Sequence, residues 1–369
     1  MIKKILAGLL SIVMVLSLAS CNTDKEWIIS SGDVSISSGV YLGYLVNSTL
    51  DAMSANECTT AKDLMKLTIE NKPAAEYVKE KALDYCKTYI VVEQKFSELG
   101  LELSEEDNSD IDSTTNAYLT YYAAYYGDNG CGAASLRKIV ESNVKLEKIF
   151  LHYYGEGGEK EVSKDDLLKQ LTENYARVQF ISIPLVETST GLSLEGDDLQ
   201  EAKDSADKYL ERAKNGEDFP ALMEEYSKSL EDSDEEETEE EEHDHDHDHE
   251  EEEEILDNGF TKNDTLVKKD DETSYPEGFV DGVFEMKNGE YKLIKTENYY
   301  FVTTRLNITE SDKTLEYYTE TLISDLKFEE FEGTYGEWKA AASYNTNNAG
   351  IKKYKAKKIK IDLSQNYTY

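Results

Sequence analysis

Four histidines alternate with aspartates in one short stretch of the chain, and these residue types can bind metal ions. The histidines are His243, His245, His247 and His249. Imidazole nitrogens and carboxylate oxygens are ligands for zinc, nickel and copper. A spacing of two on a flexible chain does not preform a site, so we expect modest affinity that depends strongly on pH. The alternative is a solvated loop inserted where the fold tolerates it. No cofactor is required in either interpretation.

The histidines lie within an acidic run, residues 231–254, that contains 18 Asp and Glu residues and neither lysine nor arginine. Such a segment buries almost no apolar area, so we expect it to be disordered. The whole chain has a net charge of −38, and about −20 remains outside the run. This acidity argues against nucleic acid as a partner.

A basic tail, residues 346–369, is the exception to this acidity. Its lysines are Lys352, Lys353, Lys355, Lys357, Lys358 and Lys360. They could contact lipid headgroups, an anionic wall polymer or the acidic surface of the protein itself, and the last alternative is the simplest.

The N-terminus has the pattern of a secretory leader. Two lysines precede an apolar run, residues 5–19, which is short for a permanent membrane span, and residues 18–21 read Leu-Ala-Ser-Cys. This ending resembles the lipobox of bacterial lipoproteins, although an ordinary signal peptide with a chance cysteine is the alternative. The resemblance implies removal of residues 1–20, diacylation of Cys21 and a stable lipid anchor on the outer face of the cytoplasmic membrane.

Three further cysteines, Cys58, Cys86 and Cys131, follow the leader. An extracytoplasmic compartment permits disulfides, but the odd number leaves at least one cysteine unpaired. Cys86 falls in a helical pattern and is expected to be a small buried residue. The chain has no Cys-x-x-Cys motif, which argues against a thiol oxidoreductase.

Hydrophobic periodicity predicts the elements that position these residues. Helices are expected over 73–99, after Ser104, over 133–154 and after Ser163. A strand over 177–185, helices over 197–213, 219–230 and 275–284, and paired strands over 291–294 and 299–306 follow. A last helix covers 311–342. Five tyrosines at positions 118, 121, 122, 125 and 126 either line a groove for unfolded chains or are half buried in the helical bundle.

This order predicts an α+β fold in which a discontinuous helical domain contains an inserted α+β domain. The last helix needs a partner for its apolar face, and the first helical block is the obvious candidate. The expected parts are a helical domain over 22–172 and 308–345, an inserted domain over 173–307 and the basic tail.

Residues 177–306 resemble a parvulin-type peptidyl-prolyl isomerase domain. The resemblance rests on residues 178–181 (Val-Gln-Phe-Ile), residues 212–219 (Arg-Ala-Lys-Asn-Gly-Glu-Asp-Phe) and residues 279–290 (Phe-Val-Asp-Gly-Val-Phe-Glu-Met-Lys-Asn-Gly-Glu). The flanking helices are similar to the chaperone domain of extracytoplasmic foldases of the PrsA and SurA type. Together with the lipobox, the resemblance covers the whole mature chain.

The resemblance implies a proline-binding site, but this chain departs from the family there. Active parvulins have one histidine in the first strand and one in the last. Here the first position falls at or next to Phe180, and the last falls at Tyr300 or Phe301, depending on a one-residue gap. The expected pocket residues are Phe180, Phe284, Met286 and Tyr300. A tyrosine could replace a hydrogen-bond donor, whereas a phenylalanine could not.

We therefore expect a membrane-anchored foldase or chaperone that binds unfolded or partly folded secreted proteins and carries a degenerate isomerase domain. Two alternatives remain: a catalytically active parvulin-type isomerase, and a metal-buffering lipoprotein.

Overall fold

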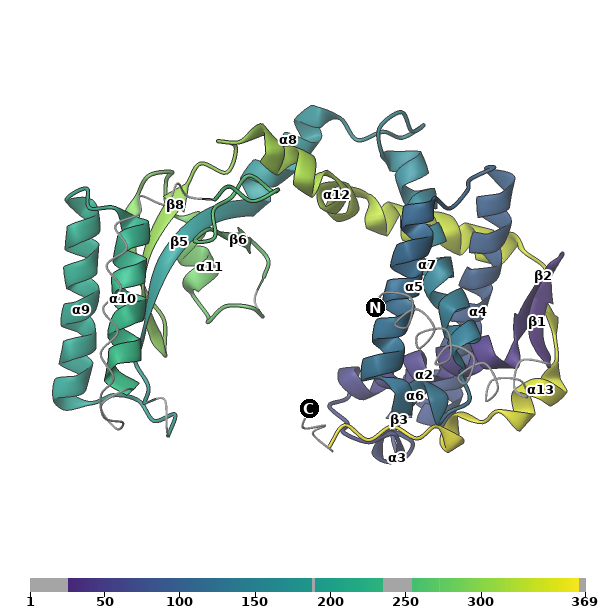
Figure 1. The fold of residues 1–369 in the computed structure, drawn as a ribbon. Helices are drawn as coiled ribbons and strands as arrows, with labels where there is room; N and C mark the ends of the chain where they lie inside the picture. Colours follow the sequence, from purple (N-terminus) through teal and green to yellow (C-terminus); the bar gives the residue numbers. More distant parts are fainter. Residues whose placement is uncertain (1–25, 188–189, 235–253, 272, 365–369) are drawn as a thin grey trace, which may run out of the picture. The chain divides into compact units, whose positions relative to one another are not determined.

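A computed structural model describes residues 26–187, 190–234, 254–271 and 273–364. The chain divides into two compact units (Figure 1). The first comprises residues up to 161 and from 327 onward, and the second comprises residues 162–326. The leader with Cys21 and residues 235–253, which include the four histidines, lie outside the described residues.

The first unit is mainly helical. Its long helices are α2 (Ser38–Ala55), α4 (Ala74–Glu98), α5 (Glu105–Tyr121) and α7 (Ala133–Tyr154), and its short ones are α3 (Ala61–Leu64), α6 (Ala123–Gly127), α13 (Asn348–Lys353) and the 3₁₀ helix η2 (Ala356–Lys358). Its strands are β1 (Trp27–Ser31), β2 (Val34–Ser37), β3 (Thr68–Ile69), β4 (Lys72–Pro73) and β9 (Asn345–Thr346). Residues of α2 and α4 form most of its core, together with side chains from the C-terminal segment.

Local sequence signals fix the ends of these helices. Pro73 immediately precedes α4, where its missing N–H costs nothing. Ser104 and Asp107 form the expected capping box of α5: the Ser104 hydroxyl accepts from the Asp107 N–H, and the Asp107 carboxylate accepts from the Ser104 N–H. Cys86 is buried in α4, and burial raises the pKa of its thiol. No disulfide joins Cys58, Cys86 and Cys131.

The second unit is an antiparallel sheet covered by helices on both faces, which confirms the expected α+β class. Its strands are β5 (Tyr175–Pro184), β6 (Thr265–Lys268), β7 (Tyr291–Lys295) and β8 (Tyr299–Leu306), in the order β6-β5-β8-β7. Its helices are α8 (Lys164–Asn174), α9 (Gly196–Lys214), α10 (Phe219–Asp234) and α11 (Phe279–Phe284). Helices α9 and α10 lie on one side of β5 and β8, and α11 lies on the other (Figure 1).

Strand alternation separates the side chains of this sheet into two faces. On the α9 face, Ile181, Ile183 and Val302 pack against α9 and α10. On the α11 face, Val178 and Phe301 pack against α11. The pairing of β5 with β8 sets this division, because it aligns Ile181 with Val302 and, one residue earlier, Phe180 with Thr303.

Two boundaries differ from the sequence prediction. The helix expected over 275–284 begins only at Phe279, because Gly278 has a φ of +86° and Pro276 forms a turn before it. The second unit spans 162–326 rather than 173–307, because α8 and the start of α12 (Asp312–Ala341) pack with its sheet. Asp325 of α12 accepts hydrogen bonds from Tyr175 of β5 and from Gln170 of α8.

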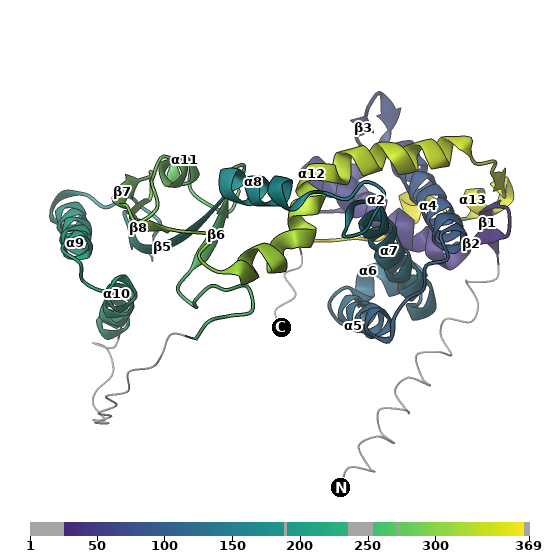
Figure 2. The same ribbon diagram turned by 90° about the horizontal axis from the view of Figure 1, so that it is seen from above.

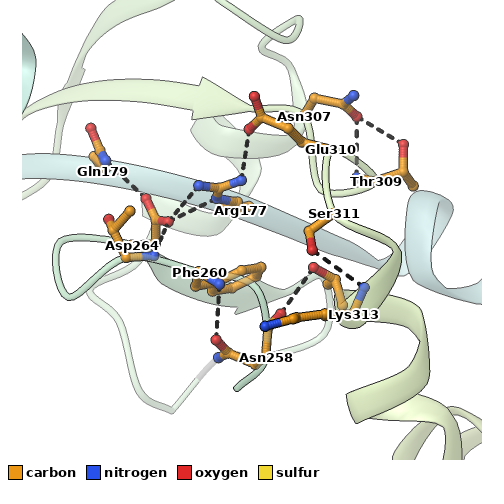
Figure 3. Close-up of polar contacts among 12 residues, drawn as sticks. Arg177, Gln179, Asn258, Phe260, Asp264, Asn307, Thr309, Glu310, Ser311 and Lys313 are labelled. Carbon is orange, nitrogen blue, oxygen red and sulfur yellow. Dashed lines mark hydrogen bonds and ion pairs between the residues drawn. The ribbon is translucent and has the colours of Figure 1, made fainter. Parts of the chain in front are cut away.

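A buried ion pair connects β5 to the segment that precedes β6 (Figure 3). The Arg177 guanidinium donates to Asp264 Oδ2 from Nη2 at 2.6 Å and from Nε at 2.9 Å. Gln179 Nε2 donates to Asp264 Oδ1 at 2.8 Å, and the Thr261 N–H donates to Oδ2 at 2.7 Å. The Asp264 side chain is fully buried, so these donors replace the water that it loses.

We predict that Asp264→Ala lowers the free energy of unfolding of the second unit by about 3–5 kcal/mol, because the buried Arg177 guanidinium then keeps only the exposed Glu310 carboxylate as its ion-pair partner. Hydrogen exchange of the β5 and β8 amides at neutral pH measures this loss. Asp270→Ala is the matched control: its carboxylate is exposed and 3.8 Å from Lys268, so its effect should stay below about 0.5 kcal/mol. Equal effects of the two substitutions would contradict the role given to Asp264.

Candidate functional site

The candidate site is the α11 face of the sheet, where Phe180 lies. Five rings form an aromatic cluster there: Phe180, Tyr275, Phe279, Tyr299 and Phe301. Ring centroids lie 4.5 Å apart for Phe279 and Phe301, 5.3 Å for Phe180 and Phe279, and 5.5 Å for Phe180 and Phe301. Such distances and tilted geometries are those of rings in direct contact.

Burial is deepest at the centre of this cluster. Phe279 is fully buried and Phe301 is 5% exposed, whereas Phe180, Tyr275 and Tyr299 are half-buried. Burial, with a smaller contribution from Asp271, raises the pKa of Tyr275. The cluster thus has an inner part formed by phenylalanine rings alone and an outer part that reaches the surface.

The structure decides which residue of the last strand accompanies Phe180. Phe301 contacts it, whereas Tyr300 points to the opposite face, where it pairs with Ile183 and packs in the α9-face core. The predicted grouping of Tyr300 with Phe180, Phe284 and Met286 is therefore wrong, because successive residues of a strand point to opposite faces. The other three residues do share the α11 face.

Polar groups near the two family positions are few. Among the described residues, the only histidine is His152 of α7, in the first unit. The Thr303 side chain is buried beside Phe180, and its hydroxyl has no hydrogen-bond partner among the described residues. The inner cluster is therefore apolar and packed, and its rings cannot donate a hydrogen bond or exchange a proton.

A charged hollow of about 480 Å³ lies next to the aromatic cluster. It is lined by Thr172, Glu173, Lys269, Asp281, Phe284, Glu285 and Arg305. The Phe284 ring lies below both cations, with the Arg305 guanidinium 5.3 Å and Lys269 Nζ 5.8 Å from its centroid. Arg305 also donates to the carbonyls of residues 283, 284 and 286 at the end of α11, and its burial lowers its pKa. Arg305 therefore holds α11 on the sheet.

Several predicted functional residues lie outside the described residues. They are Cys21, His243, His245, His247 and His249. Residues 231–234 of the predicted acidic run instead form the end of α10. Within the described residues, no group of histidine, cysteine and acidic side chains has the arrangement of a metal site, and no helix is long and apolar enough to cross a membrane.

The five tyrosines at positions 118–126 differ in their solvent exposure. Tyr118, Tyr121 and Tyr122 are 37%, 60% and 45% exposed, while Tyr126 is buried and donates to Asn47 Oδ1 at 2.8 Å. The Tyr122 ring lies 5.8 Å from that of Tyr118 and stacks with Tyr125 at 6.1 Å. The three exposed side chains form a tyrosine patch on α5 and at its C-terminal end.

Sequence reasoning missed Tyr275, Phe279 and Tyr299 as members of the cluster. Phe279 lies in the family motif, and Tyr299 directly precedes Tyr300, the residue predicted to line the pocket. The period-two alternation of β8 was the available signal, since it requires Phe301, and not Tyr300, to share a face with the side chain of residue 299.

Comparison with protein-family models and with curated proteins finds no match. Three solved structures of the foldase PrsA are similar to the chain. The Lactococcus lactis protein is 13% identical over 89% of this chain and 99% of its own, with a TM-score of 0.38. The Streptococcus pneumoniae protein is 16% identical over 75% and 91%, with a TM-score of 0.33, and the Bacillus subtilis protein is 16% identical over 91% and 92%, with a TM-score of 0.27. At these identities and TM-scores the similarity assigns no residue role, and the site is interpreted from the residues of this chain.

We predict that Phe301→Ala lowers the free energy of unfolding of the second unit by about 3–5 kcal/mol, as expected for a large ring removed from a packed core. Hydrogen exchange of the β5 and β8 amides measures the loss. Leu192→Ala, at a side chain that is 66% exposed, is the control and should change it by less than about 0.5 kcal/mol. A small effect of Phe301→Ala would indicate an open pocket instead of a packed cluster.

Proposed function

We propose that this protein is a lipid-anchored extracytoplasmic foldase that binds unfolded secreted polypeptides and does not catalyse prolyl isomerisation. The proposal combines the sequence resemblance to parvulins and foldases with the geometry of the α11 face. The observation that carries it is the direct contact between Phe180 and Phe301. The resemblance places Phe180 at or next to the first histidine position of active parvulins, and it places Tyr300 or Phe301 at the last.

Catalysis of isomerisation needs more than an apolar surface. The barrier of about 18–20 kcal/mol belongs to rotation about a partial double bond, and no covalent bond is made or broken. An enzyme lowers it by holding the amide twisted and by placing fixed polar groups where its charge changes. Rings at positions 180 and 301 supply no such groups and occupy the space between the strands and α11. We infer that an X–Pro bond bound at this face is not accelerated.

The tyrosine patch supports a role in binding polypeptides. Three exposed aromatic side chains, Tyr118, Tyr121 and Tyr122, gather within five residues of the chain. Tyrosine offers a large apolar area with a polar tip and loses little conformational entropy on binding, which suits contacts with varied apolar segments. Exposed aromatic patches of this kind often mark interaction surfaces. We propose that unfolded clients bind here.

The expected activity is suppression of aggregation without faster refolding. The mature protein should slow aggregation of a chemically denatured client and leave unchanged the rate of a refolding step that is limited by proline isomerisation. Light scattering and refolding kinetics measure the two effects on the same client. Acceleration comparable to that of an active parvulin would overturn the proposal in favour of the isomerase alternative.

Substitution of the tyrosine patch tests whether clients bind to it or to exposed apolar side chains in general. The triple variant Tyr118→Ser, Tyr121→Ser, Tyr122→Ser should weaken client binding by at least about fivefold, since aromatic anchors commonly contribute more than 1 kcal/mol each. The control replaces Leu192, Leu199 and Tyr317, which are 66%, 37% and 58% exposed, by serine. Equal losses in the two variants would exclude the patch as the client surface.

The anchor is tested on the whole protein in cells. If Cys21 is acylated, the mature chain should carry a lipid mass on its first residue and fractionate with membranes. Cys21→Ala should remove the lipid mass and leave only membrane association that high salt reverses. Salt-resistant membrane fractionation of a Cys21→Ala chain that is cut at the same place and carries no lipid mass would contradict anchoring through this residue.

A further inference from the structure

The C-terminal lysines do not lie on a loose tail. Residues 352–360 form a basic strip whose backbone is fixed on the first unit by buried side chains of Ala356, Ile359 and Ile361. Asn129 Nδ2 donates to the Lys360 carbonyl at 2.9 Å, and Asn129 Oδ1 accepts from the Lys360 N–H at 2.8 Å. All six lysines of the strip are exposed: Lys352, Lys353, Lys355, Lys357, Lys358 and Lys360.

The charges of this strip are mostly unneutralised. Lys353 Nζ pairs with Glu26 at 2.9 Å, and among the described residues the other five lysines have no carboxylate partner. The nearby Asp362 carboxylate accepts instead from the Ser364 N–H and hydroxyl. In a chain with a net charge of −38, five unpaired cations on a fixed backbone are not explained by contact with the described acidic surface of the protein.

The strip lies beside the start of the described chain. Glu26, the first described residue, accepts from Lys353 and from the Tyr354 hydroxyl at 3.3 Å. Asn347, just before α13, donates from its N–H to the Ile28 carbonyl and from Nδ2 to the Trp27 carbonyl. Helix α13 and strand β1 therefore lie side by side (Figure 2). Cys21 precedes Glu26 by five positions, so their Cα atoms lie at most about 18 Å apart.

Trp27 is an exposed aromatic residue in β1, beside the segment that leads into the basic strip. Trp27 directly follows Glu26 in the chain, and its side chain is 45% exposed. Tryptophan is enriched at membrane–water interfaces, where its ring lies at headgroup level.

We propose that the basic strip and Trp27 dock on anionic lipid headgroups of the bilayer that holds the protein. This inference deepens the proposed function, because it rests on the anchor at Cys21 to bring the strip to the membrane. A polybasic segment is attracted to an anionic bilayer within a Debye length, about 8 Å at physiological ionic strength. The strip can therefore bind although the chain as a whole is acidic. Acyl chains together with a polybasic patch hold a protein more firmly than acyl chains alone.

The test uses the mature chain without its lipid, as the Cys21→Ser form, so that the strip is measured apart from the anchor. It is mixed with vesicles of phosphatidylcholine alone or of phosphatidylcholine with phosphatidylglycerol. We expect co-sedimentation with the mixed vesicles only, decreasing with added salt, and a blue shift of tryptophan fluorescence that Trp27→Phe removes.

Charge substitution identifies the residues responsible. Replacing the five unpaired lysines of the strip by glutamine should lower partitioning onto mixed vesicles by at least about tenfold. The control replaces five exposed lysines that have no carboxylate partner and lie elsewhere among the described residues: Lys62, Lys138, Lys164, Lys203 and Lys214. Both variants change the net charge equally. If the strip is the docking surface, the control variant should lose far less partitioning onto mixed vesicles.

Three results would overturn the proposal: no preference for mixed vesicles, equal losses of vesicle binding in the two lysine variants, or binding to inorganic polyphosphate with no binding to vesicles, which would indicate a polymer ligand.

The proposed anchor at Cys21 is judged separately from the docking surface. If the chain is not acylated in cells but binds mixed vesicles through the strip, the anchor proposal is wrong and the docking proposal is supported. If the chain is acylated in cells but its unacylated form does not bind anionic vesicles, the anchor proposal is supported and the docking proposal is wrong.

Discussion

The contact among Phe180, Phe279 and Phe301 is the constraint on which the second unit depends. These rings join the two central strands to α11, and of the three only Phe180 is more than marginally exposed. A close-packed interior tolerates little change in volume, so the same rings that stabilise the sheet also determine what its surface can bind. A residue that fills a core cannot at the same time be a free catalytic group.

Under the proposed function, this constraint accounts for a parvulin-like fold that is kept without isomerase chemistry. Replacing two imidazoles by phenyl rings removes groups that must stay hydrated or hydrogen-bonded and adds apolar area that can be buried. Such a replacement would favour packing of the sheet over the polar environment that an active site needs. Buried polar groups remain where they connect elements, as at Arg177 and Asp264, and there each one is paired. In the proposed function, exposed aromatic side chains bind the clients instead.

Much of the fold could be predicted from the sequence, because its signals are local. The proline before α4, the capping box of α5 and the alternation of β5 each act within a few residues. The candidate site could be predicted only in part. Whether Tyr300 or Phe301 faces Phe180 depends on strand register, which is set by long-range pairing. The start of α11 depends on the left-handed conformation of Gly278, and the Arg177–Asp264 pair joins residues 87 positions apart.

The central claim is that the α11 face does not catalyse rotation about an X–Pro bond. Exchange spectroscopy by NMR tests it directly, with a short proline-containing peptide whose cis and trans forms give separate signals. Uncatalysed exchange takes tens of seconds or longer, so no exchange peaks should appear within a sub-second mixing time when the protein is added. Exchange peaks that grow with protein concentration, and that disappear when Phe180 is substituted, would contradict the account.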